Sequence, residues 1–239
     1  MSPIEYRSTT MLKTRFSNDL KIEAGVDEVG RGCLWGPLVS GAVVWLPEEE
    51  WTEEIRELTP QIKDSKKLSE KRRTKLAAAI EGAALDIGIG RVEASEIDAI
   101  GMTRSNQLAF ERAVASLSVE PERLLIDGIL PLNSWTDEQH TIIEGDAEYV
   151  PIAAASIVAK VYRDSWVEEW CADNATTAAT YGLASSKGYG TAVHRRAVVD
   201  HGILEQHRRL FLRKIVGEHV YEAPKEPIRT INQYLIRDE

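Results

Sequence analysis

The order of the periodic apolar segments is the feature that most constrains what this chain can fold into. The first three strand-like segments have one helix among them, between the second and the third. Further strands then alternate with helices. This order is typical of an α/β domain with a mixed sheet. The expected strands span residues 21–28, 38–46, 84–92, 123–128 and 140–146, and the expected helices span residues 69–81, 103–117 and 151–173.

The length of 239 residues fits one large domain, or one domain plus a helical appendage. Residues 1–19 are expected to form an N-terminal extension, and residues 222–239 a polar tail. Between them, residues 20–221 are expected to form the folded domain. With 43% hydrophobic and 28% charged residues, the composition is that of an ordinary globular chain.

The sequence also indicates where the chain resides. Its first 20 residues have no continuous apolar core, so a secretory signal is not expected, and no later segment is long enough to span a bilayer. Cys33 and Cys171 are far apart and belong to no Cys/His cluster with zinc spacing. We therefore expect a cytoplasmic protein without disulfides, zinc or membrane contact.

Basic residues are concentrated in two segments, although the net charge is −9. Residues 63–75 contain seven basic and two acidic side chains, and residues 187–214 contain the same numbers. Such segregation can place a phosphate-binding face on an acidic body. The alternative for the first segment is the solvated face of a helix that Ser69 caps, and both interpretations stay open.

Four acidic residues stand at or just beyond the C-terminal ends of expected strands. Asp27 and Glu28 leave the first strand, Asp127 ends the segment LLID, and Asp146 follows IIEG. Ligands bind at this edge of open α/β sheets, and four carboxylates gathered there would need a cation. Oxygen ligands favour Mg²⁺ or Mn²⁺, and two such ions can drive phosphodiester hydrolysis. A turn or a helix cap is the alternative for any one acid, whereas the set of four favours a metal site.

Seven sequence blocks stand in the order found in the ribonuclease HII family, which the chain resembles from about Ala24 to Phe211. The resemblance implies the ribonuclease H architecture, a five-stranded mixed sheet flanked by helices, with a C-terminal helical segment at about residues 190–221. The blocks are GVDEVGRG, DSKKLSEKRR, LLIDG, EGD, AAASIVAKVYRD, KGYGTAVH, and HG followed by QHRR and a phenylalanine.

The family resemblance implies an endoribonuclease that acts on RNA/DNA hybrids and on duplex DNA carrying ribonucleotides. Such an enzyme cuts on the 5′ side of a ribonucleotide with two Mg²⁺ or Mn²⁺ ions, leaving a 3′-hydroxyl and a 5′-phosphate. By resemblance, the catalytic and metal-binding carboxylates are Asp27, Glu28, Asp127 and Asp146.

Recognition of the ribonucleotide is also implied by resemblance. Gly30, Arg31 and Gly32 match the Gly-Arg-Gly segment whose backbone reads the ribose 2′-hydroxyl, the group that separates RNA from DNA. Tyr189 matches the tyrosine that packs on the neighbouring sugar. A glycine turn made for sheet packing and a half-buried loop tyrosine are the alternatives.

Further matches are expected to contact phosphates without conferring specificity. Lys160, Arg163 and Asp164 lie on one expected helix, where a charge network within the helix is as well supported as substrate contact. The expected phosphate contacts are Ser65, Lys66, Lys67, Lys187, Arg208 and Arg209.

One position departs from the family pattern, because Glu144 stands where lysine is common. It adds negative charge two residues before Asp146.

We expect a monomer. The spacing in the tail sequence INQYLIRDE suggests a replication-clamp motif, but a disordered end is the favoured interpretation of the tail. The alternatives are a ribonuclease HIII-like nuclease, a non-catalytic hybrid-binding protein and a metal-dependent phosphatase for small molecules.

Overall fold

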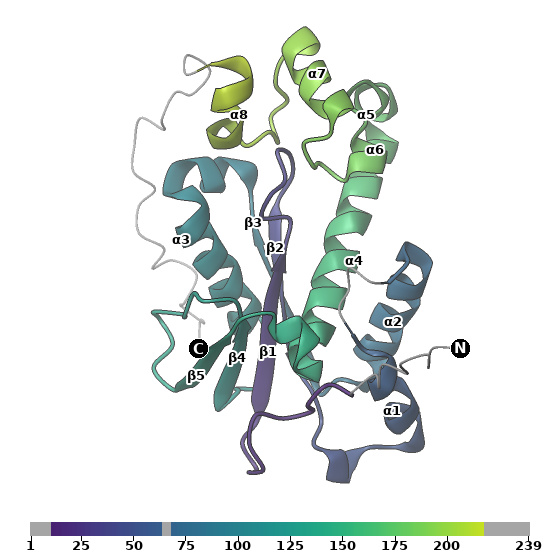
Figure 1. Ribbon diagram of the computed structural model, residues 1–239, viewed down its shortest axis with the longest axis vertical. Helices are drawn as coiled ribbons and strands as arrows, with labels where there is room; N and C mark the ends of the chain where they lie inside the picture. The colour runs from purple at the N-terminus through teal and green to yellow at the C-terminus, as the bar shows by residue number, and fades with distance from the viewer. Residues whose placement is uncertain (1–10, 64–67, 218–239) are drawn as a thin grey trace, which may run out of the picture. The chain divides into compact units, whose positions relative to one another are not determined.

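The structure, a computed structural model, describes residues 11–63 and 68–217 (Figure 1). The chain forms two compact units, a sheet unit and a helical unit. The division of the sequence into two extensions and a folded domain stays a prediction. The sheet unit comprises Met1–Val29, Val39–Arg91 and Gln107–Arg163, and the helical unit comprises Gly30–Leu38, Val92–Asn106 and Asp164–Glu239.

The sheet unit is built on five strands in the order β3-β2-β1-β4-β5. The central strand β1 (Glu23–Val29) pairs antiparallel with β2 (Leu38–Val44) and parallel with β4 (Arg123–Asp127). At one edge β5 (Glu138–Ile142) pairs parallel with β4, and β3 (Asp86–Val92) forms the other edge. The five-stranded mixed sheet that the sequence predicts is therefore confirmed.

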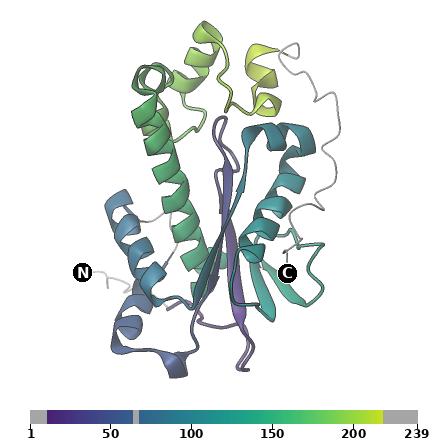
Figure 2. The ribbon, with the colours of Figure 1, turned by 180° about the vertical axis from the view of Figure 1, so that it is seen from behind.

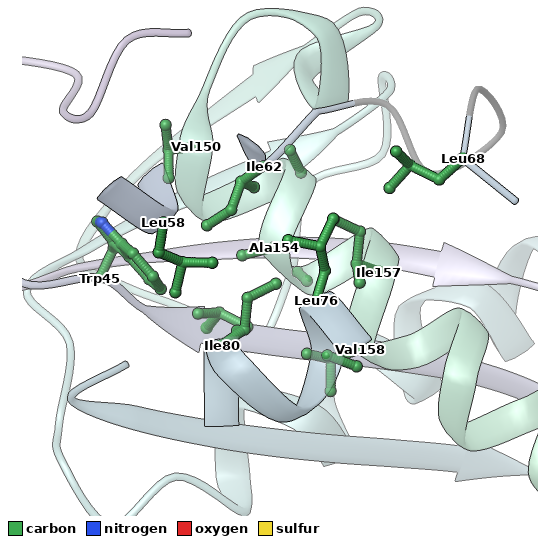
Figure 3. Close-up of a cluster of buried hydrophobic side chains, with 14 of the residues drawn as sticks. Trp45, Leu58, Ile62, Leu68, Leu76, Ile80, Val150, Ala154, Ile157 and Val158 are labelled. Atoms are coloured by element: carbon green, nitrogen blue, oxygen red, sulfur yellow. The ribbon is translucent and has the colours of Figure 1, made fainter. Parts of the chain in front are cut away.

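One face of the sheet packs against α1 (Glu53–Leu58), α2 (Glu70–Ala83) and the first part of α4 (Val150–Asp173). Figure 3 shows the apolar side chains of this layer, which include Ile80 of α2 and Ile157 of α4, both fully buried. Burying one side chain of this size contributes about 1.5–3 kcal/mol. This layer therefore stabilises the sheet on which the acidic residues stand.

The opposite face of the sheet packs against the C-terminal half of α3 (Ala94–Ala115). Figures 1 and 2 show this half of α3 and the first part of α4 on opposite sides of the strands. Phe110 of α3 packs with Ala42 and Val44 of β2, whereas Val43 belongs to the first layer. Successive side chains of a strand point to opposite faces. Both faces are covered, which explains why every residue of the segment LVSGAVV in β2 is buried.

The backbone of α4 lies directly against the two central strands. A Cβ atom on Gly25 of β1 would come within 2.2 Å of the carbonyl carbon of Pro151. A Cβ on Gly41 of β2 would come within 2.6 Å of the carbonyl oxygen of Ala155. Only glycine permits this approach, so Gly25 and Gly41 set how closely α4 packs beside the end of β1.

Most expected elements are present, with two differences at their ends. Ser69 caps α2 as predicted, because its side chain accepts a hydrogen bond from the Arg72 backbone N–H. Helix α3 begins earlier than expected and is kinked at Gly101, whose φ is 76°. The strand expected to reach Asp146 was wrong at its end. It stops at Ile142, and Glu144 takes the left-handed conformation before the 3-10 turn η4 (Gly145–Ala147).

The helical unit has its own core, in which Trp35 is fully buried against the rings of Trp166 and Trp170. Its helices are short and follow the C-terminal end of α4. They are α5 (Ala175–Tyr181), α6 (Leu183–Ser186), α7 (Ala192–His201) and α8 (Arg209–Val216). The sheet unit also contains the short 3-10 turns η1 (Glu48–Glu50) and η2 (Thr59–Gln61).

Candidate active site

The acidic residues meet around Asp27, which stands near the end of β1 with 5% of its surface exposed. Burial raises the pKa of the Asp27 carboxyl well above its usual range, and the charges of three neighbouring carboxylates raise it further. A hydrogen bond from the Ser156 side chain opposes this rise. The carboxylates that act on Asp27 belong to Glu28, Asp127 and Asp146.

Strand pairing explains why Asp27 and Asp127 meet. Because β1 and β4 are parallel, with Val26 opposite Ile126, the two aspartates come next on neighbouring strands, toward the C-terminal ends of both. Asp127 is held by the turn that follows β5, since the Gly145 N–H donates to its Oδ1 at 2.8 Å. The next residue, Asp146, is 5% exposed. The charges of Glu28, Asp127 and Asp146 all act on the Asp27 carboxyl, and the assignment of the four acids as metal ligands stays a prediction.

The donors around Asp27 fit a hard divalent cation in chemistry and in charge. All four are carboxylates, and their repulsion at a buried position would be offset by a bound cation. Within residues 11–63 and 68–217, no three His, Cys, Asp or Glu side chains are gathered closely enough to form a complete metal cluster. The fit therefore rests on the donors and their charge.

Glu144, the departure from the family pattern, is exposed. Its backbone has φ 55° and ψ 37°, in the turn between β5 and η4. The buried Asp146 lies two residues further along that turn. An exposed carboxylate is screened by water, so its extra charge weighs less than that of the buried acids.

The residues expected to recognise the ribonucleotide lie in the helical unit. Gly30 has φ 88°, a conformation that favours glycine, and its carbonyl accepts the Cys33 N–H at 3.2 Å to close the turn. Arg31 and Gly32 are exposed, and a Cβ on Gly32 would meet nothing within 4 Å. The turn therefore offers open backbone to a ligand at Gly32.

The structure places Tyr189 beside the glycine turn. Cys33 and Tyr189 form an isolated antiparallel bridge, and the Leu34 N–H donates to the Gly188 carbonyl at 2.9 Å. The Tyr189 side chain is 40% exposed. Lys187, which precedes this segment, forms an ion pair with Glu168. The contacts of Cys33 and Leu34 join two segments more than 150 residues apart in the sequence.

The environment of Arg208 changes its interpretation. Arg208 was expected to contact phosphate, but its side chain is fully buried. Its Nη1 donates to the carbonyls of Gly30 at 2.7 Å and Arg31 at 3.1 Å, and its Nε donates to the Gly36 carbonyl at 3.0 Å. Because its guanidinium is buried and bonded to these backbone carbonyls, Arg208 stabilises the glycine turn rather than contacting phosphate at the surface. Arg209 is exposed at the start of α8 and stays a predicted phosphate contact.

Several predicted residues remain without a structural test. Ser65, Lys66 and Lys67 lie outside the described residues. On α4, Arg163 and Asp164 are buried and Lys160 is partly buried, which leaves both interpretations of this group open. Sequence reasoning missed Ser156, whose only signal is a polar residue within the run AAASIVAK.

Comparisons with known proteins place the chain in one family. The family model for Ribonuclease HII matches residues 24–214. Ribonuclease HII of Prochlorococcus marinus strain MIT 9313 is 45% identical over 80% of this chain and 84% of that protein, and the Parabacteroides distasonis enzyme is 44% identical over 80% and 90%. The structure resembles ribonuclease H2 from Pyrococcus horikoshii, with a TM-score of 0.65 and 27% identity over 81% of this chain and 96% of that one. The chain therefore belongs to the ribonuclease HII family and is a metal-dependent endoribonuclease.

Proposed function

We propose that this enzyme hydrolyses the phosphodiester bond on the 5′ side of a ribonucleotide, leaving a 3′-hydroxyl and a 5′-phosphate. Its substrates are RNA/DNA hybrids and single ribonucleotides embedded in duplex DNA. The observation that carries the proposal is the buried Asp27 carboxylate with the charges of three further acids acting on it. Such a site binds hard cations, which phosphoryl chemistry uses.

Asp27, Glu28, Asp127 and Asp146 would hold Mg²⁺ or Mn²⁺ in this proposal. Bound divalent ions supply an activated water and stabilise the leaving oxygen during phosphodiester hydrolysis. The protein contributes fixed carboxylates, since Asp127 is held by the Gly145 N–H and Asp27 by the Glu28 N–H at 2.7 Å. In the fold relatives, a ribonuclease HIII structure 21% identical to this chain is described in complex with Mn²⁺.

The proposed selectivity for ribonucleotides comes from the helical unit. Backbone groups of Gly30, Arg31 and Gly32 would register the 2′-hydroxyl, and the exposed ring of Tyr189 would pack on the deoxyribose that follows. The protein backbone can approach a sugar closely at Gly32, because no side chain lies in the way. This arrangement distinguishes ribose by its extra hydroxyl, without reading the base.

Lys66 and Lys67 are proposed to contact phosphates along the duplex. Replacing both with alanine is expected to weaken duplex binding for every sequence, since fewer counterions are released on binding. In a plot of the logarithm of the binding constant against the logarithm of salt concentration, the slope should become shallower by about 0.9 for each lost contact. Fluorescence anisotropy across a salt series measures this slope. Lys75→Ala, at an exposed position of α2, is the control. An unchanged slope in the double variant would mean that Lys66 and Lys67 contact water rather than phosphate.

Cleavage assays with three substrates test the proposed function against its alternatives. We expect cleavage of a duplex with one ribonucleotide in Mg²⁺ or Mn²⁺, none in EDTA, and none of an all-DNA duplex. Binding of the ribonucleotide duplex without cleavage would favour a non-catalytic hybrid-binding protein. Hydrolysis of a small phosphomonoester in place of the duplex would favour a phosphatase.

A cytoplasmic location and a monomeric state are part of the same proposal. Among the described residues, no helix has the length and apolar character needed to cross a membrane.

The tail sequence INQYLIRDE lies outside the described residues. One solved relative, 25% identical, is an Archaeoglobus fulgidus ribonuclease HII in complex with PCNA, so clamp contact through the tail stays a hypothesis for this chain.

A further inference from the structure

Two buried histidines in the helical unit form a direct pair that the proposed chemistry does not use. His194 of α7 and His207 before α8 are 0% and 1% exposed, and their Nε2 atoms are 3.0 Å apart. Histidine is seldom fully buried, and a buried polar ring needs hydrogen bonds at both nitrogens. The partners of the two outer nitrogens therefore show what the pair connects.

The hydrogen bonds fix the tautomer of each ring. The Leu204 N–H donates to His207 Nδ1 at 2.7 Å, so this nitrogen is an acceptor and the proton of neutral His207 is on Nε2. His207 Nε2–H then donates to His194 Nε2. The proton of His194 must consequently be on Nδ1, which donates to the Tyr189 carbonyl at 2.9 Å. A single directed chain runs from the Leu204 N–H to the backbone of Tyr189.

The same segment also holds the glycine turn, through the neighbouring residue Arg208. Its guanidinium donates to the carbonyls of Gly30, Arg31 and Gly36. The Arg208 N–H donates to the Leu34 carbonyl at 2.8 Å, which aligns the two segments. Adjacent residues, His207 and Arg208, thus reach the Tyr189 backbone on one side and the Gly30 turn on the other.

We infer that His194, His207 and Arg208 are positioning residues, which hold Tyr189 at a fixed place beside the Gly30–Gly32 turn. The inference rests on the proposed role of Tyr189 and the turn in reading the ribonucleotide. Recognition of one hydroxyl and the following sugar requires both elements to be placed accurately, and a displacement of about 1 Å can reduce the rate about 100-fold. The chain of hydrogen bonds supplies this placement from within the core of the helical unit.

Paired substitutions at His194 test the inference. Asparagine reproduces the Nδ1 donor toward the Tyr189 carbonyl but loses the bond to His207, whereas glutamine reproduces the Nε2 acceptor but loses the bond to Tyr189. On a duplex with one ribonucleotide, His194→Gln is expected to lower kcat about 10-fold or more, with a smaller loss on an RNA/DNA hybrid. His194→Asn keeps the bond to Tyr189 and loses only the support from His207, so its loss on the same duplex is expected to be smaller, about threefold. Equal losses in the two variants would overturn the inference.

A double-variant cycle separates positioning from general stability. In the Tyr189→Ala background, His194→Gln is expected to cause no further selective loss, because the residue that it positions is already truncated. An additive loss would overturn the inference. A wild type that cleaves neither duplex would overturn the proposed function instead.

The ring tautomers can be measured in the unmodified protein, which keeps the inference testable if a variant does not fold. ¹⁵N NMR of the wild type at neutral pH is expected to show His194 protonated on Nδ1 and His207 protonated on Nε2. A charged ring, or the opposite tautomer in either residue, would overturn the directed chain.

The pair also predicts a dependence of stability on pH. Burial lowers the pKa of both rings, and that of His207 falls from 6.5 to about 3, with the neighbouring His194 adding to the effect. The unfolded chain binds the proton first, so stability is lost as pH falls from about 6.5 toward about 3. The other groups near the pair are the ring of Tyr181, which lies against both histidines, and beyond it the ring of His201.

His207→Asn keeps an acceptor for the Leu204 N–H and removes the titrating ring. Chemical denaturation across this pH range is expected to show a shallower loss of stability in the variant than in wild type. An identical pH dependence in the two proteins would mean that His207 is already charged in the folded state.

Discussion

Replacement of Asp27 with asparagine is expected to abolish cleavage while leaving the protein folded. The carboxylate is buried and repelled by three neighbouring acids, so an isosteric neutral side chain relieves repulsion and the melting temperature should stay the same or rise. The cleavage rate should fall by at least about 100- to 1,000-fold, the loss expected when a group that stabilises developing charge in the transition state is removed. Single-turnover cleavage and thermal unfolding measure the two effects, and duplex binding should persist.

Glu144→Gln is the matched control, because this acid is exposed and lies two residues before Asp146. It should retain cleavage, whereas Asp127→Asn should resemble Asp27→Asn. Addition of Mg²⁺ should raise the melting temperature of wild type, since a ligand that binds only the folded state stabilises it. Near wild-type turnover in Asp27→Asn, or an equal response to Mg²⁺ in that variant, would contradict the assignment.

Tyr189→Ala is expected to lose about 100-fold in cleavage of a duplex with one embedded ribonucleotide, because the surface that positions the sugar is gone. Its backbone is held by hydrogen bonds independent of the ring, so the loop should keep its place. Tyr189→Phe should be milder, since the ring contributes more to packing than the hydroxyl does. Initial rates on this duplex and on an RNA/DNA hybrid measure the effect.

Tyr162→Ala provides the control for removing an exposed tyrosine, since Tyr162 on α4 is 43% exposed and Tyr189 is 40% exposed. It should cleave both substrates at the wild-type rate. If Tyr189→Ala also cleaves the embedded ribonucleotide at that rate, the tyrosine only packs, and recognition lies wholly in the glycine turn.

Local patterns predicted the sheet and three of the acidic positions. The alternation of residues 21–28 placed Asp27 and Glu28 at a strand end, and the short apolar run before Asp127 placed it at the neighbouring end. Periodicity failed at Asp146, because the left-handed Glu144 ends the strand path before it. Neither alternation nor helical spacing carries a signal for a single backbone reversal of this kind.

The support of the glycine turn could not be predicted from local sequence. Arg208 bonds to Gly30 across 178 positions in the chain, and nothing in the basic segment distinguishes a buried guanidinium from an exposed one. The pairing of His194 and His207 likewise depends on how α7 and the segment before α8 pack. The family resemblance singled out the block that contains Arg208 but assigned this residue the role of a phosphate contact. Its burial and its hydrogen bonds to backbone carbonyls indicate instead that it stabilises the glycine turn.

The position of the cut tests the proposed function most directly. A duplex with one ribonucleotide, labelled at both ends of the cleaved strand, should yield with Mg²⁺ an upstream product with a 3′-hydroxyl deoxynucleotide end. The downstream product should begin with the ribonucleotide carrying a 5′-phosphate, and no product should form in EDTA. A cut on the 3′ side of the ribonucleotide, a 2′,3′-cyclic phosphate end, or cleavage that persists in EDTA would contradict the proposal.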